Sequence, residues 1–134
     1  MKNHEIAALF GRIADVLELK GENSFRINSY RKAARVIGDL TEDVEELARA
    51  GKLTDISGIG KGTAEKIVEY LNTGKMSKYE EAMMGVSEET VSLMQISGLG
   101  PKTVAMLNKE LGIAGLNDLE KAIQEGKLKG LFGI

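Results

Sequence analysis

The chain has no cysteine, one proline, one histidine and few aromatic residues, which make up 4% of its 134 residues. Without cysteine it forms neither a disulfide framework nor a thiolate metal site, so we expect an intracellular protein of the cytoplasm, nucleoid or nucleus. No apolar run approaches the roughly 18 residues of a membrane span, and the charged N-terminus does not match a signal peptide. We therefore expect no membrane partner.

Several catalytic arrangements are also missing from the sequence. His4 is the only histidine and is interpreted as a solvated residue near the chain start, so no Ser-His-Asp triad is present. There is no glycine-rich Walker loop and no Asp-x-Asp pair of the kind that holds two catalytic metals. The sequence therefore excludes metal-dependent polymerisation of nucleotides by this chain alone.

Charge is distributed unevenly along the chain. The net charge of −2 argues against nucleic-acid binding through a broadly basic surface. Residues 24–36 nevertheless carry four cations and no acid, and residues 52–78 carry five lysines against three acids. The acids cluster at 42–46, 80–89 and 118–125. This pattern predicts one basic face and an acidic face opposite to it. The alternative is that the charges only solvate helix surfaces.

Apolar residues recur at helical spacing almost throughout, and a hydrophobic content of 43% is enough for a real core. We expect an all-α fold. In the first half of the chain, helices are expected from Ile6 to a C-cap at Gly21, from Asn23 or Ser24 to Gly38, from Glu42 to Ala50 with Thr41 as N-cap, and from Lys61 to Asn72 before Gly74. A further helix is expected from Pro101 to Gly112. Three short helices are expected to begin after the N-caps Ser77, Ser87 and Asn117. Core positions are expected at Ile67, Val68, Leu71 and the methionines, including the pair 83–84.

One short phrase occurs three times between helical patterns. It reads ISGIG at residues 56–60, ISGLG at 96–100 and LFGI at 131–134, where the chain stops before the expected second glycine. Its glycines allow close approach of a backbone, and the helix that follows offers unpaired N–H groups and the positive end of its dipole. The phrase therefore predicts helix-hairpin-helix modules that hold phosphates without reading base sequence. A helical bundle with glycine turns is the plainer alternative.

The phrases are unequally spaced, with 40 residues between Gly58 and Gly98 and 35 between Gly98 and Gly133. A regular solenoid is therefore disfavoured. We expect two subdomains instead, 1–78 with the first hairpin and 79–134 with the second. Because the third phrase is incomplete, the chain is expected to be a fragment of a longer protein.

The motifs together resemble a known family, the N-terminal region of family X DNA polymerases, and the resemblance covers nearly the whole chain. It rests on GENSFRINSYRKAA at 21–34, ISGIGKGTAEKI at 56–67, LNTGK at 71–75 and ISGLGP at 96–101. It implies that residues 1–78 bind the 5′ side of a DNA gap, 5′-phosphate included, and that the next subdomain holds the primer strand. A polymerase catalytic domain is the implied partner within a longer chain.

The resemblance also implies roles for individual residues. Lys66 matches the lyase lysine that forms a Schiff base with 5′-deoxyribose phosphate, with Tyr30 and Glu65 beside it. The expected DNA contacts are Phe25, Arg26, Arg31, Lys32, Gly58, Gly60, Lys61, Gly62, Lys78, Gly98, Gly100 and Lys102. Gly62 replaces a phosphate-binding lysine of the animal enzyme, and Phe25 replaces a base-stacking histidine.

No cofactor is required by these expectations, but the resemblance implies Na⁺ or K⁺ at the hairpins. The backbone carbonyls of Ser57 and Ile59 are its expected ligands. The main function expected is sequence-independent binding of gapped or nicked DNA in repair. Two alternatives stay open. One is a 5′-deoxyribose-phosphate lyase acting through Lys66, which would need cationic neighbours or desolvation to lower its pKa, and the other is a protein-interaction module.

Overall fold

The computed structural model describes residues 1–96 and 98–127 of the chain. All regular structure in these residues is helical, which confirms the expected all-α fold. The elements are, in order, α1 (Asn3–Leu19), α2 (Ser24–Asp39), α3 (Val44–Arg49), the 3₁₀ turn η1 (Leu53–Asp55), α4 (Lys61–Thr73), α5 (Ser77–Met83), α6 (Glu88–Ile96), α7 (Pro101–Leu111) and α8 (Leu116–Gln124). No helix in this part of the chain is long and apolar enough to cross a membrane.

The chain divides into two compact units, residues 1–84 and 85–134. The expected boundary lay at residue 78, but α5 belongs to the first unit because it packs against α1. The Lys20 ammonium at the end of α1 donates to the carbonyls of Ala82 and Met84, at 2.6 and 2.9 Å. This ammonium satisfies carbonyls that the end of α5 leaves without helical donors.

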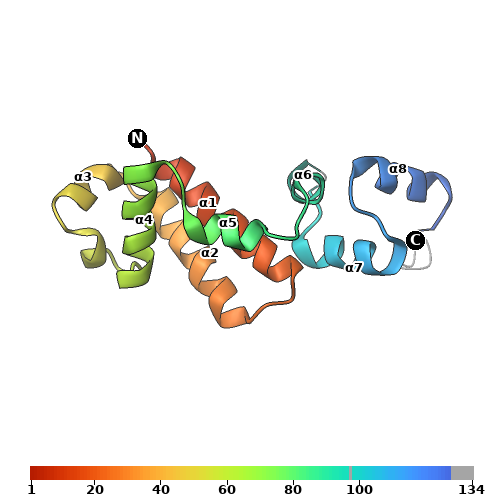
Figure 1. Ribbon diagram of the computed structural model, residues 1–134, viewed down its shortest axis with the longest axis horizontal. Coiled ribbons are helices and arrows are strands. Elements are labelled where there is room, and N and C mark those ends of the chain that lie inside the picture. Colours follow the sequence, from red (N-terminus) through yellow and green to blue (C-terminus); the bar gives the residue numbers. More distant parts are fainter. Residues whose placement is uncertain (97, 128–134) are drawn as a thin grey trace. The chain divides into compact units, whose positions relative to one another are not determined.

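The core of the first unit lies between α1 and α2, which run side by side in Figure 1. One apolar stripe of α1 is fully covered and consists of Ile6, Phe10, Ile13, Ala14 and Val16. Gly21, with φ +72°, ends α1, and the Asn23 side chain accepts from the Phe25 N–H to begin α2. Both helix boundaries agree with the sequence pattern.

The third helix begins later than expected because a distant residue organises its start. Asn3 is buried, donates to the Glu42 carbonyl at 2.6 Å and accepts from the Val44 N–H at 2.9 Å. Asp43, not Thr41, is the N-cap, and its side chain accepts from Glu45 N–H. The expected cap at Thr41 was therefore wrong.

Other local expectations were corrected by side-chain contacts. Ser77 is not a cap but the first residue of α5, and Glu69 accepts both its N–H and its hydroxyl. Val68 is 38% exposed, and Met84 is exposed as well, so neither belongs to the core. Ile67, by contrast, is fully buried.

The second unit packs α6, α7 and α8 around its own core. The buried side chains include Val91, Leu93, Met94, Val104, Leu107, Ile113 and Leu119. Ser87 caps α6 by accepting from the Thr90 N–H, as expected. Gly115, not Asn117, precedes α8, and Asp118 reaches back to accept from the Ala114 N–H.

Candidate nucleic-acid interface

The first hairpin connects α3 to α4 through η1 and a tight turn. Leu53 and Ile59 anchor the turn in the core, each 4% exposed. The Ile59 N–H donates to the Ile56 carbonyl at 3.0 Å, and Gly58 lies between them with φ +95°. Residues with a side chain rarely adopt this backbone conformation, so the turn requires glycine at position 58.

Gly58 also lies against α2. A Cβ built on it would stand 3.1 Å from Val36 Cγ2 and 3.2 Å from Lys32 Cε. We expected the missing side chain to leave room for DNA, but the space is already filled by α2. Gly58 therefore lets the hairpin pack on α2 and places the aliphatic part of Lys32 beside the turn.

Gly60 has the opposite environment. Its backbone is extended, with φ −86° and ψ 179°, and a Cβ there would meet nothing within 4 Å. It is the N-cap of α4 and supplies no side-chain hydrogen bond, while its carbonyl accepts the first helical bond, from Ala64 N–H. The N–H groups of residues 61–63 have no acceptor within the helix, and they form an open site for an anion.

Lys66 lies one turn into α4, on the same side of the helix as Gly62. Its ammonium is 3.4 Å from the Gly62 carbonyl and 5.8 Å from the centre of the Tyr30 ring. A Cβ on Gly62 would lie 3.8 Å from this ammonium, so the glycine leaves the space in front of it open. The structure thus brings together three of the expected site residues, Tyr30, Gly62 and Lys66.

We expected cationic neighbours around Lys66, but the structure also places an acid beside it. Glu69 is next to it, and hydrogen bonds from Ser77 hold the pKa of Glu69 below its usual value, with a further contribution from the Lys66 charge. Lys78 is paired with Glu81 at 3.3 Å, so its charge is balanced within α5. Glu65 points to solvent and has no ion pair in the described residues.

Tyr30 forms the wall of this site on α2. It is half-buried, and its ring centre lies 6.1 Å from that of Phe10 in the core. Burial raises the pKa of the Tyr30 hydroxyl, and the neighbouring Arg26 opposes part of that rise. Tyr30 is therefore a neutral, fixed ring at pH 7, with Arg26 held near its hydroxyl.

The exposed face of α2 continues from this wall toward its N-terminus. Phe25 is 84% exposed, which is unusual for an aromatic ring. A shallow cavity of about 200 Å³ is lined by Phe25, Asn28, Ser29 and Lys32. Proteins that bind single-stranded nucleic acids use this arrangement, in which an exposed ring stacks on a base and a neighbouring cation contacts a phosphate.

Arg31 does not share this face. Its guanidinium donates to Asp15 at 3.0 Å and to Glu18 at 2.6 Å, both on α1. Burial works against the charge, but the two carboxylates outweigh it and raise the pKa of Arg31. Arg31 therefore joins α2 to α1, and the structure does not place it with the other expected DNA contacts.

The second hairpin has glycines at the corresponding positions of the second unit. Gly98 has φ +73° and Gly100 is the N-cap of α7 without a side-chain bond. A Cβ on either glycine would meet nothing within 4 Å. Pro101 is the first residue of α7 and has no N–H, so the exposed Lys102 is the first residue that offers one. Ser97 and the whole third phrase, 131–134, lie outside the described residues.

The expected cation ligands lie in the first turn. The Ile56 carbonyl accepts the Ile59 N–H, whereas those of Ser57 and Ile59 take part in none of the turn's hydrogen bonds. Carbonyl oxygens are the ligands that hard cations prefer, so Na⁺ or K⁺ at these two residues stays a prediction. In the described residues no cluster of three acidic or histidine side chains offers another metal site.

Comparison with known proteins agrees with this geometry. A family model described as a helix-hairpin-helix domain matches residues 1–76, which include α1 to α4 and the first hairpin. The chain belongs to this helix-hairpin-helix family. The second hairpin lies beyond the matched residues, and it is indicated by the repeated phrase and by its own geometry.

Two curated relatives extend the similarity into the second unit. The chain is 39% identical over 133 residues to the DNA polymerase/3'-5' exonuclease PolX of Bacillus subtilis, covering 99% of this chain. It is 34% identical over 119 residues to DNA polymerase lambda of Arabidopsis thaliana, covering 88% of this chain. The resemblance to family X polymerases is thereby confirmed. The chain spans only 23% and 22% of these two relatives.

Proposed function

We propose that the chain binds gapped or nicked DNA through backbone phosphates, without sequence preference, as part of DNA repair. The observation that carries this proposal is the open N-terminus of α4 behind Gly60, with its unpaired N–H groups and the neighbouring Lys61. The Gly100 end of α7 repeats the arrangement with Lys102. Membership of the helix-hairpin-helix family and similarity to two DNA polymerases support it.

The first unit offers more than one contact to a DNA end. The N–H groups at the start of α4 are suited to a phosphate, the Lys32 ammonium extends beside the same turn, and Phe25 offers a stacking surface. A strand end with an unstacked base and a 5′-phosphate uses all three, whereas intact duplex presents no free base to Phe25. This difference favours gapped DNA over intact duplex.

A titration tests the proposal. Gapped, nicked and intact duplexes of one sequence, each with and without a 5′-phosphate, are compared by fluorescence anisotropy at several salt concentrations. We expect the 5′-phosphorylated gap to bind most tightly, with affinity falling by a log–log slope of a few units because few phosphates are contacted. Equal affinity for all the duplexes would contradict gap recognition. A complex that is insensitive to salt would favour the protein-interaction alternative.

Gly98 provides a matched test in the second unit. Gly98→Ala and Gly112→Ala both place a methyl group in open space at similar φ, +73° and +67°. Each should cost about 1–2 kcal/mol of backbone strain. Only Gly98 lies in the hairpin, so we expect weaker DNA binding for Gly98→Ala and unchanged binding for Gly112→Ala. Equal binding by the two variants would remove the second hairpin from the proposed interface.

A lyase activity is the second candidate function, and the position of Lys66 favours it. Its ammonium lies 3.4 Å from the Gly62 carbonyl and 5.8 Å from the centre of the Tyr30 ring, at the proposed 5′ end. In the neutral form it would add to C1′ of the opened sugar and release water to give a Schiff base. Loss of the C2′ proton then eliminates the 3′-phosphate. No metal takes part in these steps.

Borohydride trapping on DNA that carries a 5′-deoxyribose phosphate tests this activity. An active lyase gives a covalent adduct at Lys66, and Lys66→Ala loses most of it while still binding gapped DNA. Lys75→Ala is the control, because Lys75 is an exposed lysine just beyond α4. Equal trapping by wild type and Lys66→Ala, or none by either, would leave the chain as a DNA-binding module.

A further inference from the structure

The second unit carries an apolar surface that the proposed DNA contacts do not use. Leu116 and Ile123 are 42% and 57% exposed, and they are the only large hydrophobic side chains described as exposed in this unit. Both belong to α8 and are two helical turns apart, so they lie on one face of it. Two exposed apolar side chains on one helix face make this face a candidate contact surface.

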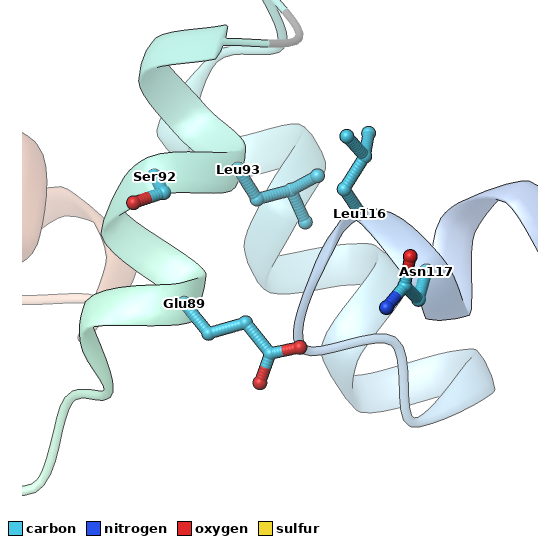
Figure 2. A pocket seen from close by; sticks show the side chains of 5 residues that line it. All are labelled: Glu89, Ser92, Leu93, Leu116 and Asn117. Carbon is cyan, nitrogen blue, oxygen red and sulfur yellow. The ribbon is translucent and has the colours of Figure 1, made fainter.

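A cavity opens beside the first of these residues. It has a volume of about 290 Å³ and is lined by Glu89, Ser92, Leu93, Leu116 and Asn117. Figure 2 shows the Leu93 and Leu116 side chains on one side of it and the Glu89 carboxylate extending from α6 toward the segment that leads into α8. Its lining is thus apolar on one side and acidic on another, which suits an amphipathic occupant.

Negative charge lies beside this apolar surface. Glu88 and Glu89 begin α6, and Asp118 and Glu120 belong to α8, whereas Glu125 is paired with Lys127 at 2.9 Å. Glu89 lines the cavity and has no ion pair within the described residues, and Glu120 lies between Leu116 and Ile123 on the same face of α8. These carboxylates repel phosphate, so DNA is a poor occupant.

We propose that this face of α6 and α8 docks a protein segment that is basic and apolar. An apolar anchor would fill the cavity against Leu93 and Leu116, and lysine or arginine side chains beside it would pair with Glu89 and Glu120. Complementary charge sets which partners dock, while burial of the apolar anchor supplies most of the affinity. The proposed occupant of this surface is a protein rather than a nucleic acid.

Binding of designed peptides to the full chain tests this proposal. The probe is a dye-labelled amphipathic peptide of leucine and lysine, and its control replaces every lysine with glutamate. The chain has no tryptophan whose fluorescence could report binding, so the anisotropy of the dye on the peptide is the readout. We expect the leucine–lysine peptide to bind and the leucine–glutamate peptide not to bind.

Four variants locate the contact. Ile123→Ser and Glu120→Lys should each weaken binding of the leucine–lysine peptide about tenfold or more. Val68→Ser and Glu110→Lys remove an exposed apolar group and an exposed acid elsewhere and should leave it unchanged. All four positions are exposed, so circular dichroism should report folded proteins. Equal binding of the two peptides, absence of binding, or equal losses in all four variants would overturn the proposal.

Discussion

Lys32 of α2 packs against Gly58 of the first hairpin: a Cβ at position 58 would stand 3.2 Å from Lys32 Cε. Gly58→Ala should therefore lower the free energy of unfolding by about 2 kcal/mol or more, since it adds overpacking against α2 to the strain of φ +95°. Gly51→Ala is the control, because Gly51 has φ +67° and open space around it. Urea unfolding measures both. Equal losses would contradict the packing role of Gly58.

Two neighbouring cations of α2 should behave differently toward DNA. Lys32→Ala should weaken binding and reduce the salt slope by about one unit, because one phosphate contact is lost. Arg31→Ala should leave DNA binding unchanged and cost only about 1 kcal/mol of stability or less, because its guanidinium pairs with Asp15 and Glu18 in a partly exposed position. An equal change of the salt slope in Arg31→Ala and Lys32→Ala would contradict these separate roles.

Sequence pattern predicted the helices best where a local residue determines the boundary. Gly21, Gly74 and Gly112 all have positive φ and close their helices, and Pro101 begins α7. These residues act through their own backbone, so their effect is visible in a short window of sequence. The hairpin positions of Gly58 and Gly98 were predicted for the same reason.

The missed features depend on contacts between distant residues. Thr41 is a reasonable local cap, but Asn3, from the start of α1, binds Glu42 and Val44 and fixes the start of α3. Arg31 looks like one more cation of a basic helix until Asp15 and Glu18 are placed opposite it. In the candidate site, likewise, the sequence indicated Lys66 but gave no sign that Ser77 would hold Glu69 beside it.

Asn3 is the buried polar residue on which this long-range contact depends, and its loss should be costly. Asn3→Ala leaves the buried Val44 N–H and the partly buried Glu42 carbonyl without their side-chain partner. We expect the free energy of unfolding to fall by about 1–3 kcal/mol. His4→Ala, at an exposed neighbouring position, should change it by less than about 0.5 kcal/mol. Chemical unfolding of both variants checks the difference.

The Glu69 contact predicts a pH dependence near Lys66. Hydrogen bonds from Ser77 lower the pKa of Glu69 in the folded chain, so the stabilisation is fully present above its ordinary value of 4.5. It is lost as the pH falls through the lowered value. A ¹³C NMR titration of the Glu69 carboxyl should therefore show its pKa rising toward the ordinary value in Ser77→Ala. An unchanged pKa would mean that the Ser77 hydroxyl does not hold this carboxylate.

The most direct test of the central claim is one variant measured twice, Gly60→Asp. An aspartate at this N-cap accepts from the free N–H groups of α4 and meets no neighbour, so the chain should be as stable as wild type or slightly more stable. The same carboxylate occupies the anion site and repels phosphate, so affinity for gapped DNA should fall at least about tenfold. A chain of undiminished stability that binds gapped DNA as tightly as wild type would contradict phosphate binding at the first hairpin.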